Sequence, residues 1–490
     1  MEMEFREREI RCLRQSAADV AAAEQTLELR LPENMPPVGR VLGAWGQCIL
    51  RGKEWQSDHV RVNGGVMVSA LYESENGHDL QCVDGWIPFQ LRWDLKDSHK
   101  DGDLIVSCVV REVDARQMGA EKLLLRASVS AMAQALEENS YPWYEPIDAG
   151  EVQLKQQQME LCLPTEAGER RIQLEEIILP PPGQTPMDRL LFGQLLPAVR
   201  EAKILEDKLM LRGVASYHLV YLGEDGMLHV WDGEIPISQL ASLEQEYGPE
   251  AMLWVEPAIT GLEFTALEDG RLVIKAEILG QYVVYDHPAI SLVVDAYCPG
   301  CTVELKRQQV MLPNVKSRKT EQLMISQTQP EQAAEVVDSA ITMAQPRLSA
   351  KEGVLEGTAK SLYYDDDSRL RMQQQPVNQT FPLPEGKWQG WLSALPKVHS
   401  NVAADGIQLQ ATAELQLMEV ETDGVSMVSG LTVEQPAENK NRPSLIVRRA
   451  DGLSLWELAK KCDSTVEAIR LANGLAGELD GNPMLLIPVM

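Results

Sequence analysis

The sequence predicts a mainly β protein, with three tandem related β-sandwich or barrel-like modules, minor helices, and a small C-terminal βααβ domain. Three observations support this fold class. A residue pattern returns after about 150 positions, which is the size of a domain. Stretches that alternate apolar and polar residues follow turn dipeptides, as in half-buried antiparallel strands. The last part of the chain carries two helix-capping patterns between two short apolar strands.

Two motifs carry the repeat. Residues 151–164 read EVQLKQQQMELCLP and residues 302–313 read TVELKRQQVMLP, so the pattern V-x-L-K-x-Q-Q occurs twice. The second motif occurs three times and consists of glycine, an apolar strand, a tyrosine and an acidic turn. Its tyrosines are Tyr72, Tyr221 and Tyr363. We therefore expect three related modules in which these tyrosines, Tyr72 and Tyr221 above all, occupy equivalent strand positions.

Further features recur after each acidic turn. A strand ends in an apolar residue followed by proline, and a turn dipeptide then precedes the long strand that closes the module. The apolar-proline pairs are Ile87-Pro88, Ile235-Pro236 and, as the weakest match, Phe381-Pro382. The turn dipeptides are Met118-Gly119, Asp269-Gly270 and Asp405-Gly406. Antiparallel sheet is the prediction for all three modules.

Helical periodicity is limited to short stretches, and it predicts helices over Ala17 to Leu27 and Met187 to Ala202. The stretch Gln435 to Pro443 is polar, ends in proline and has no periodicity, which is typical of a linker. The predicted division is a first β module with an N-terminal extension at 1–147, a second at 148–297, a third at 298–433, a linker at 434–443 and a C-terminal domain at 444–490.

Charge and hydropathy restrict the partners. The 73 acidic and 45 basic residues give a formal net charge of −28, which repels nucleic-acid phosphates and anionic lipid. The first residues, MEMEFREREIRCLRQ, are charged where a signal peptide needs an apolar run, and no later stretch has the ~18 apolar residues of a membrane span. We expect a cytoplasmic protein with no nucleic-acid partner, no membrane insertion and eight reduced cysteines.

No pattern in the sequence indicates catalysis. Cys298-Pro-Gly-Cys301 has the spacing of half a zinc site or a redox pair, but no second half follows, so a turn at a module junction is the preferred interpretation and metal or redox chemistry the alternative. Asp365-Asp366-Asp367 lacks the spaced carboxylates of a calcium loop and is expected to be a solvated turn. The prediction is no enzyme, no catalytic residue, no metal and no cofactor.

Local rules describe the C-terminal domain almost completely. Leu445 to Arg449 and Met484 to Val489 are predicted strands. Between them, Ser454 with Glu457 and Ser464 with Glu467 form two S-x-x-E capping boxes, each of which opens a short helix. Asn473-Gly474 is the expected left-handed stop of the second helix.

These residues resemble the LysM family, whose pattern includes Gly-Asp-Thr-Leu-Trp at the first helix, Thr-Val-Glu at the second, Asn-Gly, and a closing Leu-x-Ile-Pro strand. The matching positions are Gly452, Ser454, Leu455, Trp456, Val466, Glu467, Asn473, Gly474, Leu485, Ile487 and Pro488. The resemblance implies a ligand groove between the loop before the first helix and the loop after the second. Its residues here are Gly452, Leu453, Ser454, Asn473, Gly474 and Leu475.

Two positions depart from the family pattern. Leu453 replaces the usual aspartate of the loop, and Asn482-Pro483 replaces the usual Pro-Gly. Leucine cannot hydrogen-bond a sugar hydroxyl, so the change favours a protein ligand over the N-acetylglucosamine polymers that LysM domains commonly bind. Leu453 can either meet a partner or staple the first helix, and Trp456 can either fill the small core or contact a ligand.

As a whole, three repeats with a terminal LysM domain resemble the SPOCS-domain spore coat morphogenetic proteins of clostridia. The resemblance implies a mother-cell scaffold or adaptor of spore coat assembly, which binds through its LysM domain the coat ATPase that polymerises on the forespore surface. The alternative function is a peptidoglycan- or N-acetylglucosamine-binding LysM protein. An enzyme is the third hypothesis.

Overall fold

The computed structural model describes residues 2–3, 5–77, 79–95, 101–146, 151–180, 182–394, 397–434, 443–477, 479, 481 and 483–490. The chain is mainly β, with 75% of residues in strands and 3% in two short helices, which confirms the predicted fold class. Of the predicted linker, residues 435–442 lie outside the described residues, as does Asn482.

Two antiparallel three-stranded sheets form the first module, and their inner faces enclose one apolar core. One sheet has the order β2 (Phe5–Arg30), β7 (Lys122–Pro146) and β6 (Asp103–Gly119). The other has the order β3 (Val38–Trp55), β4 (His59–Ser74) and β5 (Leu80–Asp94).

The second and third modules repeat this plan. In the second, β9 (Leu163–Ile178), β14 (Leu272–Asp286) and β13 (Met252–Ala266) form one sheet, and β10 (Met187–Leu205), β11 (Lys208–Gly223) and β12 (Leu228–Ser242) form the other. In the third, β16 (Thr302–Gln329) pairs with β23 (Gly406–Glu434), and two short strands, β21 (Trp388–Ala394) and β22 (Val398–Ala403), take the place of one long strand. Its second sheet contains β17 (Glu335–Met343), β19 (Glu352–Tyr364), β20 (Leu370–Pro382) and β18 (Arg347–Leu348).

Both helices predicted within the modules are wrong. Ala17 to Leu27 belongs to β2 and pairs along its length with β7, where its alanines pack against the core with a period of two. Met187 to Ala202 belongs to β10, which is apolar on both faces because Leu195 enters its own module's core while Phe192 packs against the neighbouring modules. Tertiary pairing overrides local helical propensity at both places.

The tyrosines of the repeat occupy corresponding places. Tyr72 in β4 and Tyr221 in β11 are both buried, and each donates a hydrogen bond to a backbone carbonyl 36 residues earlier, that of Pro36 at 3.0 Å and that of Thr185 at 3.2 Å. Tyr363 lies opposite β17 in the same way. The third apolar-proline pair is not equivalent, because Pro382 lies opposite Glu352, whereas Pro88 and Pro236 lie opposite Gly65 and Val214, seven residues before their tyrosines.

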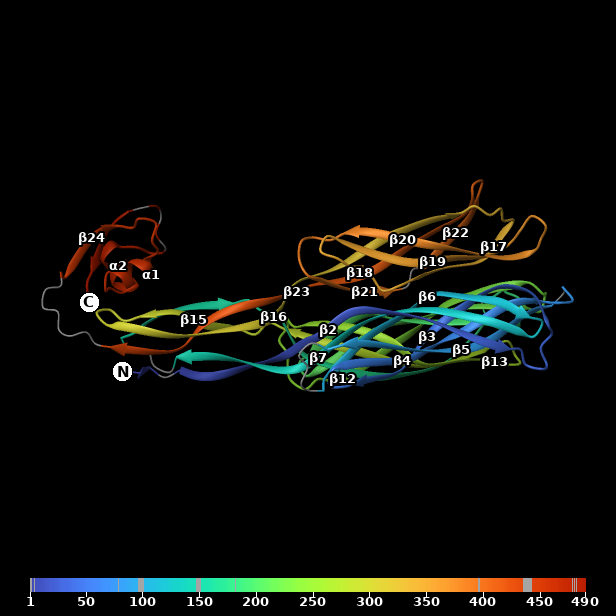
Figure 1. Cartoon of the computed structure of the whole chain (residues 1–490), viewed down its shortest axis with the longest axis horizontal. Coiled ribbons are helices and arrows are strands. Elements are labelled where there is room, and N and C mark those ends of the chain that lie inside the picture. Colours follow the sequence, from blue (N-terminus) through green and yellow to red (C-terminus); the bar gives the residue numbers. More distant parts are fainter. Residues whose placement is uncertain are drawn as a thin grey trace.

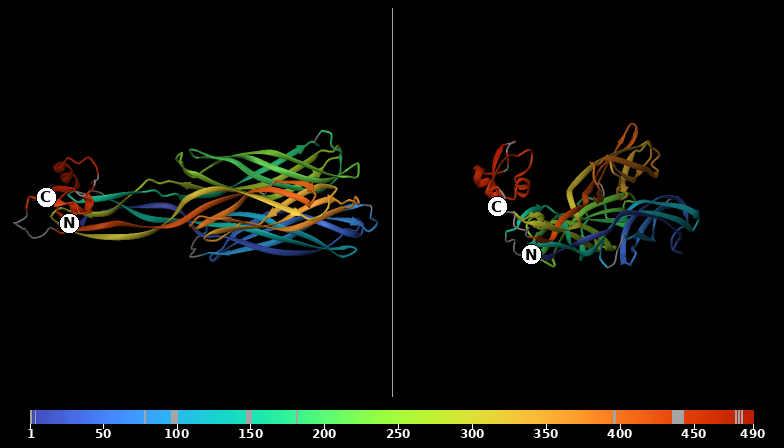
Figure 2. Two further views of the ribbon diagram at one scale, coloured as in Figure 1. Left: turned by 90° about the horizontal axis from the view of Figure 1, so that it is seen from above. Right: turned by 60° about the vertical axis from the view of Figure 1, so that its left-hand side comes forward.

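The three modules lie side by side in the body (Figure 2), and they share apolar clusters where they meet. In one cluster, each module contributes the residue that precedes its tyrosine, and these residues are Leu71, Val220 and Leu362. In a second cluster, Ile105, Trp254 and Trp391 come from β6, β13 and β21, and the ring centroids of the two tryptophans lie 4.2 Å apart. Corresponding strands therefore face a common centre, and the three modules form one body.

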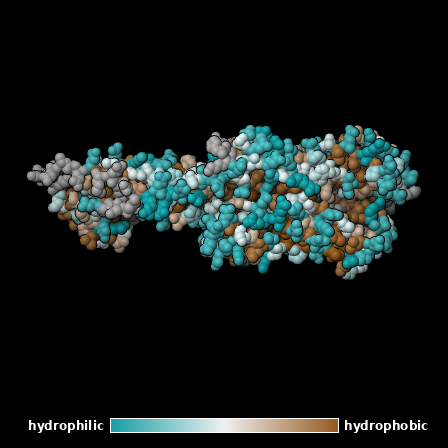
Figure 3. Space-filling model, turned by 90° about the horizontal axis from the view of Figure 1, so that it is seen from below, coloured by the Kyte–Doolittle hydropathy of each residue, from teal (hydrophilic) through white to brown (hydrophobic). Residues whose placement is uncertain are grey.

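A stalk of three antiparallel ribbons leaves this body at one end (Figure 1). The ribbons are the start of β2 with the end of β7, β8 (Gln153–Met159) with β15 (Ile290–Tyr297), and the start of β16 with the end of β23, which also pairs with β1 (Glu2–Met3). The V-x-L-K-x-Q-Q motif lies here: Leu154 and Leu305 pack on the stalk core, while Lys155 is exposed. The stalk core consists of two clusters of buried apolar residues, one with Val152, Ala296, Cys298, Leu431 and Val433, the other with Ile10, Cys12, Leu161, Leu312 and Met427. The face of the stalk seen in Figure 3 is mostly hydrophilic.

The C-terminal module, residues 444–490, contains β24 (Leu445–Arg449), α1 (Leu455–Lys461), α2 (Val466–Asn473) and β25 (Met484–Pro488). The first capping box is present, with Ser454 and Glu457 bonded reciprocally, and Gly474 ends α2 in the left-handed conformation. The second capping box is wrong, because Thr465 caps α2 and the buried hydroxyl of Ser464 has no hydrogen-bond partner among the described residues. Within the described residues, no helix is long and apolar enough to cross a membrane.

Candidate functional site

The C-terminal module rests on the tip of the stalk. Tyr297, at the end of β15, packs into the module's apolar core, and its hydroxyl donates to the backbone oxygen of Ser464 at 3.0 Å. The ring of Trp456 lies edge-on to that of Tyr297, with centroids 4.8 Å apart. Gly300 also donates from its backbone nitrogen to Asp463, at 3.4 Å. We call Asp295, Tyr297 and Gly300 the seat.

Asp295 is the charged centre of the seat. One carboxylate oxygen accepts a hydrogen bond from the indole nitrogen of Trp456 at 2.8 Å, and Lys460 donates to both oxygens at 2.7 and 2.8 Å. Burial alone would raise the pKa of Asp295, but the bonds from Lys460 and Trp456 outweigh it and lower that pKa. Helix α1 is therefore held to the stalk by charge-assisted hydrogen bonds.

Trp456 packs against the small apolar core of the C-terminal module, which is one of the two roles considered for it from the sequence, and it has a further role. The side chain is half-buried, and it joins the C-terminal module to the stalk through Asp295 and Tyr297. Sequence reasoning missed this role because the two partners lie some 160 residues earlier in the chain.

The Cys298-Pro-Gly-Cys301 sequence forms the predicted turn, closed by a hydrogen bond from the Cys301 nitrogen to the Cys298 oxygen at 3.2 Å, with Gly300 at a φ of 70°. Both cysteines are free. Cys298 packs in the stalk core, and burial raises the pKa of its thiol to about 12. In the part of the chain that the structure describes, no three His, Cys, Asp or Glu residues are grouped so that they could hold a metal ion.

The predicted groove is built from residues that already have structural partners. Leu453 and Leu475 are half-buried and pack against the same apolar core. The hydroxyl of Ser454 caps α1. The side-chain amide of Asn473 donates to the oxygens of Ile469 and Leu486, at 2.8 and 2.6 Å, and accepts from the nitrogen of Leu486 at 2.8 Å.

The two glycines complete the predicted site. Gly452 and Gly474 are exposed, with φ angles of 76° and 63° that favour glycine over any other residue. The six predicted residues therefore offer exposed backbone more than free polar side chains.

A different part of the C-terminal module exposes apolar side chains. Among the described residues, sixteen large apolar side chains are exposed, and six of them belong to this module, which is about a tenth of the chain. They are Leu445, Val447, Leu471, Met484, Leu486 and Met490. The sequence carried a signal for this surface, since both strands have apolar residues at consecutive positions, and one face of a two-stranded sheet must then remain uncovered.

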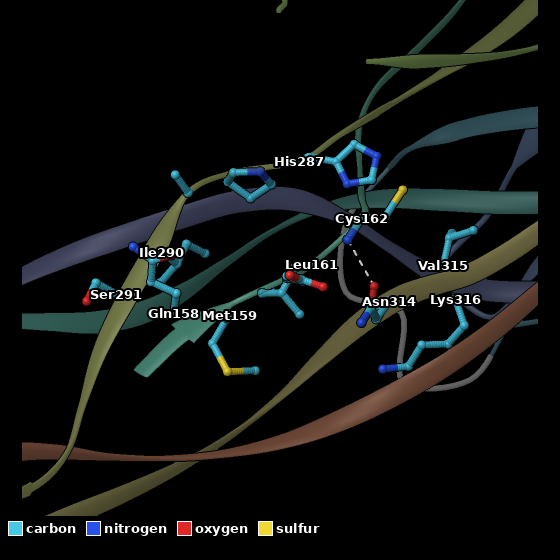
Figure 4. Close-up of a pocket in the computed structure, with 13 residues that line it drawn as sticks. Gln158, Met159, Leu161, Cys162, His287, Ile290, Ser291, Asn314, Val315 and Lys316 are labelled. Atoms are coloured by element: carbon cyan, nitrogen blue, oxygen red, sulfur yellow. Dashed lines mark hydrogen bonds between the residues drawn. The ribbon is translucent and has the colours of Figure 1, made fainter. Parts of the chain in front are cut away.

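One shallow pocket of about 610 Å³ lies where the stalk joins the body (Figure 4). Two of its polar side chains, those of Asn314 and Lys316, have partners within the protein. The side-chain oxygen of Asn314 accepts from the backbone nitrogen of Cys162 at 2.9 Å, and its nitrogen donates to Asp423, which also accepts from Lys316. Burial raises the pKa of the Cys162 thiol to about 11, so this thiol is not an activated nucleophile.

No protein-family model, no curated protein and no solved structure matches this chain.

Proposed function

We propose that the chain is a non-enzymatic scaffold or adaptor in spore-envelope assembly, which binds a coat morphogenetic protein through its C-terminal module. The observation that carries the proposal is the placement of that module. It sits at the tip of the stalk, held by Trp456 and Lys460 on Asp295, and it has the highest density of exposed apolar side chains in the described chain. Exposed apolar patches of this kind are typical of protein-protein contacts.

The charged side chains at the module boundaries support a structural role over a catalytic one. His218 of the second module lies between Asp232, at 2.7 Å, and Asp338 of the third, at 3.2 Å. Lys360 of the third module donates to the backbone oxygens of Ala44 and Val113 in the first, at 2.8 and 2.6 Å. These groups hold the modules together, and each has its partners inside the protein.

The partner and the compartment come from the resemblance to the SPOCS-domain proteins. The partner is then the coat ATPase of the forespore surface, and the place of action is the mother-cell cytoplasm and the growing coat. The composition agrees with such a location, since a net charge of −28 keeps a large scaffold soluble and away from nucleic acid.

A glycan ligand is less well supported. Sugar recognition needs free hydrogen-bonding side chains, and the amide of Asn473 and the hydroxyl of Ser454 already have partners within the module. The side chain of Leu453 has no hydrogen-bonding group.

The test compares purified full-length chain with a chain stopped at Gln435, using the purified coat ATPase and chitin oligomers as two separate ligands. We expect the full-length chain to bind the ATPase and the shortened chain to lose at least about tenfold in affinity, with an unchanged thermal melt of the body. A third protein, Leu453→Asp, restores the aspartate of the LysM pattern. Measurable oligomer binding that improves in this variant, with no ATPase binding by the full-length chain, would replace the scaffold proposal by a glycan-binding one.

A further inference from the structure

The register of the two-stranded sheet in the C-terminal module determines which backbone groups face outward. Ile446 lies opposite Ile487, and the flanking bonds, from Val489 nitrogen to Ser444 oxygen and from Ala450 nitrogen to Pro483 oxygen, are both 3.1 Å long. In an antiparallel pair, hydrogen-bonded and non-hydrogen-bonded residues alternate. The backbone groups of Leu445, Val447 and Arg449 therefore point away from β25.

The opposite edge of the sheet is already closed. The side-chain amide of Asn473 makes the hydrogen bonds that a neighbouring strand would make with β25. It accepts from the backbone nitrogen of Leu486 and donates to the backbone oxygen of Leu486. Within the described residues, no group pairs with the outer edge of β24. This edge is thus the open one of the sheet, and open edges are templates for a further strand.

Apolar side chains lie beside this open edge. Leu445 and Val447 are 49% and 58% exposed, and Met484 and Leu486 of β25 are 58% and 41% exposed on the same face of the sheet. This face is on the far side of the module from the seat, as Figure 1 shows for β24 and α1. The stalk therefore leaves both the edge and the face uncovered.

We propose that an extended, apolar segment of the partner protein adds to β24 as a third strand of this sheet. The inference rests on the proposed function, because it specifies how the C-terminal module binds a protein. The segment would exchange main-chain hydrogen bonds with Leu445, Val447 and Arg449, and its alternate side chains would extend the apolar face. Such a segment has apolar residues at every second position.

A partner segment fits this site better than a second copy of the chain. Two five-residue strands about 5 Å apart offer a face of roughly 170 Å², far below the roughly 800 Å² per partner of a stable interface between two folded surfaces. Main-chain hydrogen bonds can hold a single strand on so small a face. Charge points the same way: residues 444–490 carry five basic and six acidic side chains, so nearly all of the net charge of −28 lies elsewhere, and it opposes self-association.

The first measurement is amide hydrogen exchange on the full-length chain, alone and with the purified coat ATPase. In the free protein the amides of Leu445, Val447 and Arg449 should exchange rapidly, while those of Ile446 and Arg448 are protected by β25. Binding should slow exchange at the first three by roughly tenfold or more. Rapid exchange at these amides in the complex would refute strand addition. Protection that grows with concentration in the absence of ATPase would identify a second copy as the occupant, which also overturns the proposal.

The second measurement uses single-residue variants of the full-length chain. Val447→Pro removes an amide that faces the open edge and bonds to no residue that the structure describes, so the module should fold while affinity for the ATPase falls roughly tenfold or more. Leu445→Lys, which leaves the backbone intact, should also weaken binding. Leu240→Lys, which changes a similarly exposed leucine in β12, an edge strand of the body, is the control for substitution of an exposed apolar residue, and it should change affinity less than about threefold.

The outcomes separate this inference from the proposed function. If stopping the chain at Gln435 abolishes ATPase binding but Val447→Pro and Leu445→Lys do not weaken it, the C-terminal module binds by another surface and strand addition is wrong. If the shortened chain binds as well as the full-length chain, the proposed function fails, and the inference fails with it.

Discussion

The indole nitrogen of Trp456 donates a hydrogen bond of 2.8 Å to Asp295, which lies 161 residues earlier in the chain. The bond connects α1 of the C-terminal module to β15 of the stalk, and Tyr297 adds an aromatic contact beside it. These contacts fix the orientation of the C-terminal module relative to the stalk, which a covalent connection alone would not do. The open edge of β24 then faces outward from the end of an elongated molecule.

Removing the charge of Asp295 should loosen the C-terminal module. Asp295→Asn keeps an acceptor for Trp456 but loses the ion pair with Lys460, and hydrogen bonds to charged groups of this kind contribute about 1.5–3 kcal/mol. We expect faster proteolysis of the C-terminal module and faster amide exchange in α1, with an unchanged thermal melt of the body. Asp269→Asn, in an exposed turn of the second module, is the control. Equal proteolysis rates in the two variants would show that Asp295 does not hold the module.

His218 should stabilise the contact between the second and third modules. Burial would lower its pKa, but the hydrogen bonds that its ring donates to Asp232 and Asp338 outweigh burial and raise the pKa to about 10. His218→Gln leaves the buried carboxylate of Asp338 without its cation, which should cost about 3 kcal/mol of unfolding free energy at pH 7.

The control for this change is His229→Gln. His229 pairs with Asp225 in the exposed acidic turn of the second module, and such surface pairs contribute less than about 1 kcal/mol.

Because the pKa of His218 is raised by folding, its contribution to stability is complete below the unfolded value near pH 6.5 and is lost as pH rises towards 10. Urea unfolding at pH 6.5 and pH 9.5 should show a smaller loss of stability in His218→Gln than in the unmodified protein.

Protonation of Glu256, at the boundary between the first and second modules, should also make the free energy of unfolding depend on pH. Glu256, in β13, is 6% exposed, and its burial raises its pKa to about 8 against a small lowering by a hydrogen bond from Ser107. Between the unfolded pKa near 4.3 and pH 8, the folded chain keeps a proton that the unfolded chain has lost. The free energy of unfolding therefore falls as pH rises through this window.

Glu256→Gln should remove that dependence, because the amide has no proton to lose. We expect the variant to be more stable than the unmodified protein at pH 8 and about equal to it below pH 4.5, measured by urea unfolding. Glu263→Gln, an exposed residue of the same strand, should leave the pH profile unchanged. Parallel pH profiles for Glu256→Gln and the unmodified protein would show that Glu256 is ionised at neutral pH in the folded state.

Much of the fold could be predicted because period-two patterns and turn dipeptides are local. The stalk could not, since nothing local distinguishes a strand that leaves the body from one that stays in it. A signal for it did exist: Phe5, Ile10 and Cys12 have the spacing of Leu154, Met159 and Leu161, and all six pack on the stalk core. In this first copy, charged residues stand where the other copies have glutamines, so the repeat is hard to recognise in the sequence.

The candidate site was predicted less well than the fold. The structure has loops before α1 and after α2, where the predicted site residues lie, but the resemblance to LysM could not show that Asn473 closes the edge of β25. Nor could it assign Trp456 to the seat, because that contact depends on how a distant ribbon ends. Contacts between modules are set by tertiary packing, and a single sequence carries little local trace of them.

The cysteine pair of the stalk tip should be chemically inactive and unequal in its structural effect. Cys298 is 5% exposed and packs in the stalk core, whereas Cys301 is half-buried. Cys301→Ser should leave the melting temperature within about a degree, while Cys298→Ser buries a hydroxyl and should cost about 1–3 kcal/mol.

Metal content should be zero for the unmodified protein and both variants. A thiol with a pKa near 12 is almost entirely protonated at pH 7.5, so Cys298 should react with iodoacetamide only on unfolding. Rapid alkylation of Cys298 in the folded chain, or zinc that co-purifies and is lost when both cysteines are replaced by serine, would instead assign this turn a metal or redox role.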